Sequence, residues 1–131
     1  MPLDDAVREL ATGSNLAALT TLFPDGQPQT QLMWVDADED HVLINTEVHR
    51  AKFRNVQRDP RVTVTIWPKD DPYRYVEVRG RVTGIVQGPA ARDHIDACAQ
   101  RYFGRDYDAG QIESERAILR ITPDRVLRRG V

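Results

Sequence analysis

The sequence is poor in several features that mark common protein classes. Its 131 residues include one cysteine, Cys98, so no disulfide framework is expected and a reducing cytoplasmic compartment is the default. The 18 basic and 20 acidic residues leave a net charge of −2, without the basic excess of a non-specific nucleic-acid binder. No apolar run approaches the ~18 residues of a membrane helix. The acidic start at residues 1–5 is unlike the basic head of a signal peptide. We therefore expect neither a nucleic acid nor a membrane as a partner.

Several catalytic motifs are also missing. The eight glycines never form Gly-x-Gly, which excludes a dinucleotide fingerprint and a phosphate loop. The serines, Ser14 and Ser114, lie outside any Gly-x-Ser-x-Gly sequence, which argues against a serine hydrolase. His94 and Cys98 have the i, i+4 spacing of two metal ligands, but Cys98 falls on an apolar stripe, so a buried cysteine and a surface histidine are expected. We assign no metal ligand and no catalytic acid or base.

The length fits one domain, residues 1–131, which is long enough to bury a core. Apolar residues at helical spacing predict a helix over 3–12, ended by Gly13. Three apolar runs follow, separated by turns at 24–26 and 36–40, and their succession predicts an antiparallel meander. These strands are expected at 16–23, 29–35 and 41–46.

The second half alternates between short helices and strands. A helix over 51–58 is stopped by Asp59-Pro60, because the residue before proline avoids the helical region. Along the strand 74–86, Val76, Val78, Val82 and Val86 are predicted to share one face with the glycines at 80 and 84, which suggest a bend. The remaining elements are a strand over 61–67, a loop over 68–72, a helix between Gly88-Pro89 and Gly104, a polar loop over 105–114 and a strand over 117–126 interrupted at Pro123. The pattern predicts a mainly β fold, a small barrel of about six antiparallel strands with short peripheral helices.

One segment concentrates positive charge. Residues 49–61 carry five of the 18 cations and one acid, Asp59. Arg50 and Lys52 fall at the start of the predicted helix, where exposed N–H groups already carry about half a positive charge. Cations are unfavourable there unless an anion is bound, and a phosphate would bring the N–H groups and both side chains together.

Two other interpretations of this segment stay open. It is either a solvated basic face in which Arg58 and Arg61 pair with the acidic turns, or a nucleic-acid surface. The net charge and the lack of aromatic residues on that helix count against nucleic acid.

The segment also carries a family resemblance. The sequence Gly26-x-Pro28, then Asn45-Thr46, then Arg50-Ala51-Lys52-x-x-Asn55-x-x-x-Asp59-Pro60-Arg61-Val62 resembles the pyridoxamine 5'-phosphate oxidase-like split β-barrel superfamily. Within that superfamily it is most similar to short members that use the deazaflavin coenzyme F420. The resemblance implies a homodimer of split barrels with a cofactor in each of two clefts at the subunit interface.

The same resemblance implies the cofactor-binding residues. Arg50 and Lys52 would hold the phosphate, and Tyr73, Tyr75 or Arg79 would reach across from the partner subunit. The other residues expected at the cofactor are Pro28, Gln29, Gln31, Asn45, Thr46, Ile66, Trp67 and Pro68, with Trp34 further along the second strand.

The function expected from this resemblance is hydride transfer between reduced F420 and a small conjugated acceptor. FMN is the alternative cofactor, because it shares the tricyclic ring, the ribityl chain and the phosphate. A non-catalytic protein that binds or stores the cofactor is the alternative function, because a fold and a cofactor do not establish a reaction. The sequence has no clear counterpart of the substrate-binding motif at the C-terminus of true pyridoxamine phosphate oxidases, so oxidation of vitamin B6 phosphates is not expected.

Overall fold

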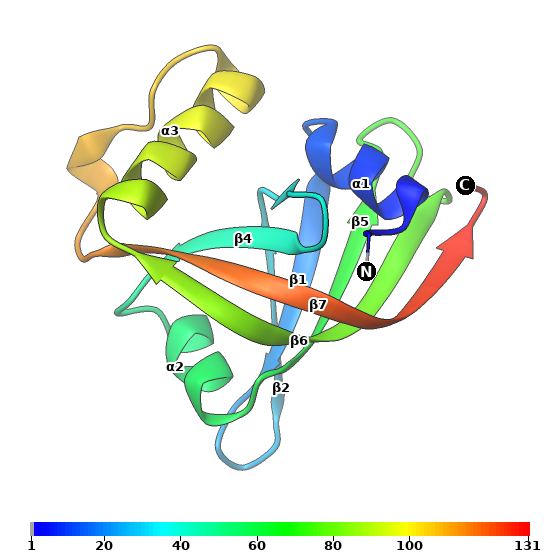
Figure 1. The fold of residues 1–131 in the computed structure, drawn as a ribbon, viewed down its shortest axis with the longest axis horizontal. Coiled ribbons are helices and arrows are strands. Elements are labelled where there is room, and N and C mark those ends of the chain that lie inside the picture. The colour runs from blue at the N-terminus through cyan, green and yellow to red at the C-terminus, as the bar shows by residue number, and fades with distance from the viewer. Residues whose placement is uncertain (1) are drawn as a thin grey trace.

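A computed structural model describes residues 2–131 (Figure 1). One antiparallel sheet of seven strands dominates it, and helices lie around the sheet. The elements are α1 (Asp5–Thr12), β1 (Leu16–Leu22), β2 (Pro28–Met33), β3 (Asp36–Ala37), β4 (Val42–Glu47), α2 (Ala51–Arg58), β5 (Arg61–Trp67), β6 (Tyr75–Gln87), α3 (Pro89–Phe103), a 3-10 turn (Ala109–Gln111) and β7 (Arg116–Arg129). No helix in the described part of the chain has the length and apolar character needed to cross a membrane.

The sheet curls into a split β-barrel, as the sequence predicts. Its strand order is β2-β1-β5-β6-β7-β4-β3, and the long strands β6 and β7 bend so that they pair with both halves of the sheet. In Figure 1, α2 lies below the curled sheet, whereas α3 and α1 lie above it toward opposite ends. The barrel differs from the expected six strands by one addition, the two-residue β3, which falls in the segment predicted as an acidic turn.

The predicted meander of three strands is wrong. β1 and β2 do form a hairpin, but β4 pairs with β7 along its whole length, and β2 stays at the sheet edge. The sequence gives no local signal for this pairing, because the two strands are about seventy residues apart and the apolar pattern of β4 fits either neighbour. The pairing places Glu47 opposite Arg116 and Asn45 opposite Ile118.

Two irregularities in the pairing of β6 with β7 change the predicted faces. A register shift between Val82 and Gly84 inserts an extra residue, so Ile85 packs against the main core, and Val86 packs instead against a second cluster beneath α3. The prediction that Val86 shares a face with Val76 is therefore wrong. β7 also continues through Pro123, because the missing N–H of proline falls at the other irregularity, opposite Gly80.

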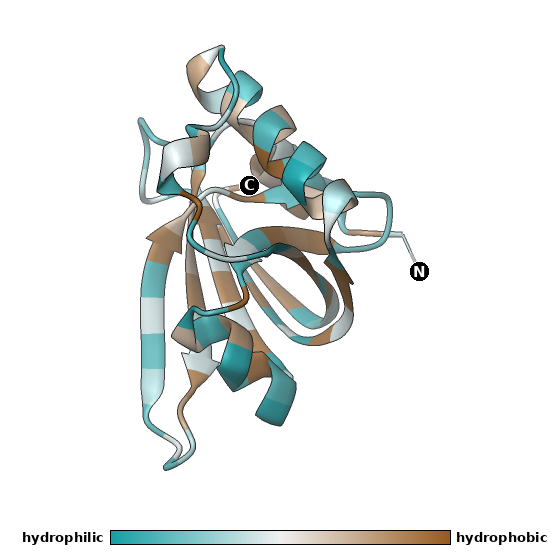
Figure 2. Cartoon of the chain, turned by 90° about the vertical axis from the view of Figure 1, so that its left-hand side faces the viewer, coloured by the Kyte–Doolittle hydropathy of each residue, from teal (hydrophilic) through white to brown (hydrophobic). Residues whose placement is uncertain are grey.

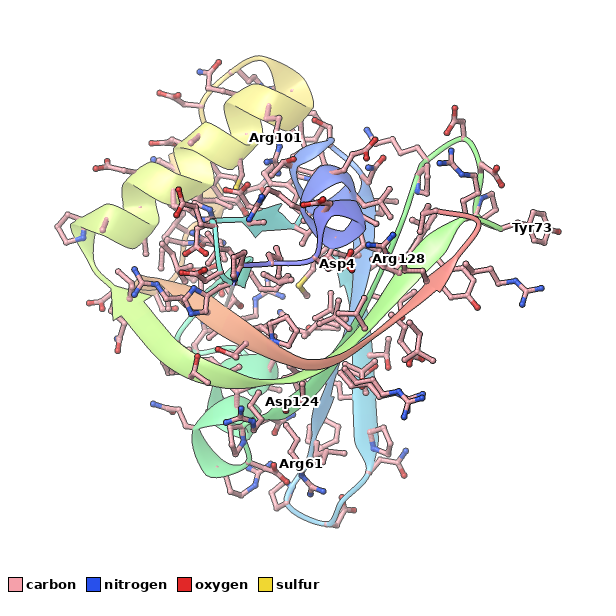
Figure 3. All side chains as sticks on the ribbon, turned by 45° about the vertical axis from the view of Figure 1, so that its right-hand side comes forward. Asp4, Arg61, Tyr73, Arg101, Asp124 and Arg128 are labelled. Carbon is pink, nitrogen blue, oxygen red and sulfur yellow. The ribbon has the colours of Figure 1, made fainter. Side chains whose placement is uncertain are left out.

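The core fills the inside of the curled sheet. In Figure 2, brown and teal bands alternate along strands, as expected for a sheet with one buried face. Helix α1 contributes Val7, Leu10 and Ala11, and its N-terminus is capped by Asp4, which accepts hydrogen bonds from the N–H groups of Ala6 (2.9 Å) and Val7 (3.2 Å). Asp4 also pairs with Arg128 of β7 at 2.7 Å, and Figure 3 shows the two side chains together.

Gly80 is predicted to be irreplaceable at the bend, whereas Gly84 is not. A Cβ atom on Gly80 would lie 2.3 Å from the carbonyl oxygen of Thr122, so β6 and β7 would have to separate. A Cβ atom on Gly84 would meet only the flexible side chain of Arg120, at 3.4 Å. We expect Gly80→Ala to lower the free energy of unfolding by about 2 kcal/mol or more, and Gly84→Ala to change it by less than about 1 kcal/mol. Urea denaturation of both variants measures this, and equal losses would contradict the assignment of the close approach to Gly80.

Candidate functional site

A cleft of about 350 Å³ opens beside the N-terminus of α2. Strands β2 and β4, the N-terminal end of α2, helix α3 and the segment between α3 and β7 supply its walls. The lining residues are Gln31, Leu32, Met33, Trp34, Asn45, Thr46, Glu47, Arg50, Lys52, Ile95, Phe103, Tyr107, Gln111 and Arg116. The walls fall into a charged end and an apolar, aromatic end.

The charged end is built around Lys52. Its side chain is only 7 % exposed, and within residues 2–131 no hydrogen-bond acceptor or acid pairs with its ammonium group. Burial, and then the nearby cations Arg50 and Arg116, lower the pKa of Lys52 to about 8. Arg50 is exposed and sits at the N-cap of α2 without capping it through its side chain, and the first turn of α2 contains no acid. A cation without a partner at an uncapped helix N-terminus has the charge and the free N–H groups that suit an anion.

Arg116 completes this end and is held on several sides. Its Nε donates to Asn45 Oδ1 (2.8 Å), Nη1 lies 3.4 Å from Glu47 Oε2, and the guanidinium lies over the ring of Tyr107. Burial alone would raise the pKa of Glu47, but the N–H groups of Ser114 and Glu113, each 2.7 Å from Oε1, and the charge of Arg116 lower it. The cleft therefore carries three cations and one carboxylate, Glu47, which is engaged by two backbone N–H groups and by Arg116.

The aromatic end centres on Trp34. Its indole stacks on Tyr102 with the ring centroids 4.8 Å apart, and the rings of Phe103 and Tyr107 contact it edge-on. The Tyr102 hydroxyl donates to the Asn15 carbonyl, which anchors the stack to the barrel. Two of the few exposed large apolar side chains in the described residues, Leu32 and Phe103, line this cleft. Such exposure at a cleft indicates a surface for an apolar ligand.

Asp36, His94 and Cys98 form a cluster next to the cleft. Their ligand atoms lie within 4.8 Å of one another, close enough to hold a metal ion. The surrounding hydrogen bonds oppose that use, because a metal on His94 Nε2 requires a proton on Nδ1, where Asn45 Nδ2 already donates at 3.0 Å. The other oxygen of Asp36 is engaged by Arg101 at 2.8 Å. We interpret the cluster as an ion-pair network.

This cluster corrects one prediction and confirms another. The imidazole of His94 is only 12 % exposed and donates to Asp36 Oδ2 at 2.9 Å, so the expected surface histidine is wrong. Cys98 is buried, as predicted. Burial opposes charge on His94, but Asp36 and Cys98 favour it, and these groups by themselves raise the pKa of His94 to about 9. The N–H of Asn45 acts in the opposite direction on the same ring.

Half of the residues expected at the cofactor meet in the cleft. The structure brings together Gln31 of β2, Asn45 and Thr46 of β4, and Arg50 and Lys52 at the start of α2. These residues are up to 21 positions apart in the chain, and those of β4 and α2 converge because a short connection joins β4 to α2.

The other five residues lie outside the lining of this cleft. Pro28 is exposed at the start of β2, and Gln29 accepts a hydrogen bond from Asn55 at 3.3 Å. Ile66 is fully buried in the barrel core, while Trp67 and its neighbour Pro68 are half-buried at the end of β5. Contact of Pro28, Gln29, Ile66, Trp67 and Pro68 with a cofactor stays a prediction.

Other residues of the basic segment have structural roles. Asn55 is buried and donates to Thr21 at 3.0 Å, which fastens α2 to β1. Arg58 donates to the Leu22 carbonyl, and Arg61 pairs with Asp59 at 2.7 Å. The expectation that Arg58 and Arg61 pair with the acidic turns is therefore wrong.

The candidates for contact across a subunit interface lie away from the cleft. Tyr73 is 83 % exposed and points outward from the loop between β5 and β6 (Figure 3). Tyr75 is half-buried, and Arg79 pairs with Glu77 at 2.7 Å. Their role in a partner's site stays a prediction.

Sequence reasoning missed Glu47, Arg116, Tyr107 and Phe103. In the sequence nothing distinguishes Glu47 from other acids near the end of a strand, or Arg116 from the other fifteen arginines. The signal that identifies both is the pairing of β4 with β7, which sets Glu47 opposite Arg116 and is visible only in the fold. Tyr107 and Phe103 belong to the polar loop and the end of α3, whose path over the cleft no local pattern predicts.

The fold and the cleft define a class of protein: a split β-barrel suited to a flavin-type redox cofactor. A family model described as pyridoxamine 5'-phosphate oxidase matches residues 3–129 of this chain. The chain therefore belongs to the pyridoxamine 5'-phosphate oxidase family, as the sequence resemblance predicts.

Solved structures agree with this assignment. An F420 reductase is 29 % identical, with a TM-score of 0.82 over 95 % of this chain and 98 % of that one. A conserved hypothetical protein from Mycobacterium tuberculosis is 26 % identical, with a TM-score of 0.76 over 97 % of this chain and 84 % of that one. HutZ, the heme storage protein from Vibrio cholerae, is 12 % identical, with a TM-score of 0.66 over 99 % of this chain and 96 % of that one, and shows the fold alone.

Lys52 is predicted to cost the unliganded protein stability. The pKa of Lys52 is about 8 in the folded protein and 10.5 in the unfolded chain. The loss of folding stability caused by its charge is therefore fully present below pH 8 and disappears as the pH rises to 10.5. Lys52→Met, which keeps the apolar stem, should raise the free energy of unfolding at pH 7 by on the order of 1–3 kcal/mol. Urea denaturation at pH 7 and near pH 10.5 should show this gain shrinking. The control is Lys69→Met, at the other lysine, which is exposed and should have little effect. A destabilised Lys52→Met protein at pH 7 would contradict the prediction.

Proposed function

We propose that this protein is an oxidoreductase that binds F420 in the cleft and serves hydride transfer to a small conjugated acceptor. The single observation that carries the proposal is Lys52, a residue only 7 % exposed, which lines the cleft at the uncapped N-terminus of α2 and whose ammonium group has no hydrogen-bond or ion-pair partner within residues 2–131. Family membership and the similarity to an F420 reductase over nearly the full length of both chains support it.

The charged end of the cleft fits a phosphate. Lys52 and Arg50 would approach it from the helix, and Arg116 would approach from β7, held in place by Asn45 and Glu47. A bound anion would also replace the missing acid in the first turn of α2 and raise the pKa of Lys52. The residues present therefore suit the group that FMN and F420 share.

The aromatic end fits a planar ring system. Trp34 is fixed by its stack on Tyr102, and Phe103 and Tyr107 form side walls. When bound, the deazaflavin would supply the hydride chemistry. The chain's own residues would hold the ring in a fixed orientation against an apolar wall and keep water away from it. No side chain is assigned as a proton donor, and solvent would supply the proton.

F420 is preferred to FMN because its tail carries additional carboxylates. Arg54 is exposed on α2, one turn beyond Arg50, and is the cation placed to meet them, although one of its nitrogens already donates to the His49 carbonyl at 2.5 Å. Arg58, one turn further along α2, is held by hydrogen bonds to Leu22 and Asn55.

The proposal includes a homodimer with the cofactor at the interface, as the family resemblance implies. Leu32 and Phe103 are exposed at the rim of the cleft, where a second subunit would cover them together with a bound ring. Sedimentation equilibrium of the purified chain measures its oligomeric state. A protein that stays monomeric while it binds the cofactor tightly would remove the dimer from the proposal.

Cofactor binding is the direct test. The purified protein, titrated with F420 and with FMN and followed by fluorescence, should bind F420 more tightly. Replacing Arg50 and Lys52 together with alanine should weaken binding by a few kcal/mol, since a hydrogen bond to a charged group is worth about 1.5–3 kcal/mol. The control is Arg61→Ala, beyond the other end of α2 and outside the lining of the cleft, where Arg61 is exposed and pairs with Asp59. The affinity of this variant for F420 should be unchanged. Unchanged affinity in the double variant, with a normal circular dichroism spectrum, would show that the cluster is only a solvated surface.

A storage protein is the second candidate function, because no acid or base was identified and HutZ, which has this fold, stores heme. Stopped-flow oxidation of reduced F420 by quinones and enones separates the two functions. We expect the protein to accelerate the oxidation of reduced F420 by at least one acceptor. Tight F420 binding without acceleration by any acceptor would favour storage.

A further inference from the structure

A chain of hydrogen bonds runs from α3 into the charged end of the cleft. Arg101 Nη1 donates to Asp36 Oδ1 (2.8 Å), and His94 Nε2 contacts Asp36 Oδ2 (2.9 Å). His94 Nδ1 contacts Asn45 Nδ2 (3.0 Å), and Asn45 Oδ1 accepts from Arg116 Nε (2.8 Å). The chain joins Arg116, which lines the cleft, to a histidine that does not.

Two groups with a fixed role, the Arg116 Nε donor and the Ala91 carbonyl acceptor, determine the direction of each hydrogen bond made by Asn45. Arg116 Nε can only donate, so the oxygen of the Asn45 amide must face it. The Ala91 carbonyl can only accept, and it lies 2.9 Å from the amide nitrogen of Asn45. The remaining N–H of Asn45 then points at His94 Nδ1, which must be a bare acceptor. The proton of the neutral ring therefore sits on Nε2 and is donated to Asp36.

A second proton on His94 would break this arrangement. An N–H on Nδ1 would face the N–H of Asn45, and the contact would be lost. Turning the Asn45 amide over would not repair it, because its nitrogen would then face Arg116 Nε and its oxygen would face the Ala91 carbonyl.

The charges around the ring come from each element packed against it. They are Asp36 on β3, Cys98 and Arg101 on α3, and, through Asn45 on β4, Arg116 on β7. Asp36 and Cys98 favour the imidazolium, while burial and the N–H of Asn45 disfavour it. The two protonation states of the ring differ in whether Asn45 can hold Arg116.

We propose that His94 is a positioning residue for the cleft: in its neutral form it fixes Asn45 and thereby Arg116 for anion binding, and its protonation releases them. This inference rests on the proposed use of the cleft for an anion. It predicts that acid weakens anion binding as His94 titrates. A simple gain of positive charge predicts the opposite, since another cation near the cleft would strengthen binding.

The test compares the wild type with His94→Gln across about pH 5 to 10, the range in which a histidine titrates. Glutamine presents an acceptor and a donor without titrating, and both proteins keep Lys52, whose own titration then cancels in the ratio of dissociation constants. Sulfate, whose charge is constant over this range, and F420 serve as separate probes. We expect a ratio near one on the alkaline side of the His94 titration and a weakening of the wild type by about tenfold or more on the acid side, the loss of one hydrogen bond to a charged group. A flat ratio, or tighter wild-type binding in acid, overturns the proposal.

A second measurement does not depend on the variant. The ¹⁵N chemical shifts of the His94 ring in the wild type should show that Nε2 keeps its proton throughout and that Nδ1 gains one in acid. A neutral ring with its proton on Nδ1 would overturn the proposal. If F420 fails to bind but sulfate shows the expected ratio, the proposed cofactor is wrong and the role of His94 stands. If sulfate binds with a flat ratio, the role of His94 is wrong, and the proposed function is not affected.

Discussion

The pairing of β4 with β7 places Glu47, a carboxylate that is 1 % exposed, opposite Arg116, and the cleft depends on that pairing. Glu47 accepts two backbone N–H groups from the segment that precedes β7 and faces Arg116 with its other oxygen. It thereby fixes the segment that forms the outer wall of the cleft and one of the three cations inside it. A buried carboxylate is stable only when its oxygens are satisfied, and here the satisfying groups are themselves the walls of the site.

The site combines stabilising and destabilising features. Asn55, Phe53 and Val56 hold α2 against the barrel, so the start of the helix is rigid. Lys52 at that start is unfavourable in the unliganded protein, because burial and the charges of Arg50 and Arg116 outweigh the attraction of Glu47 and the first turn of α2 contains no acid. Binding sites commonly carry such uncompensated charge, since the ligand supplies the compensation. The phosphate of a redox cofactor is the ligand that we propose for this arrangement.

The hydrogen bonds of the cleft continue to α3. Asn45 lies between Arg116 and His94, and its amide can satisfy both only in one orientation. Asp36, His94 and Cys98 have the composition of a metal site. Their side chains are instead joined by hydrogen bonds whose directions suit a neutral histidine. The direction of hydrogen bonds, more than the type of the residues, decides what this cluster can do.

Local patterns in the sequence determined most of the elements and part of the site. The alternation in residues 61–67, the proline after Asp59 and the apolar positions of the first helix act over a few residues, and the structure has these elements as predicted. The resemblance around residues 50–62 pointed to Arg50 and Lys52, which lie at the start of a helix that the local sequence predicts. Only the tertiary structure decided which strand accompanies β4, on which face Val86 lies, and that Glu47 and Arg116 line the cleft while Asn45 connects it to His94. Strand pairing over seventy residues, a one-residue irregularity and the direction of a buried amide leave no periodic trace in the sequence, because each is settled by packing between distant segments.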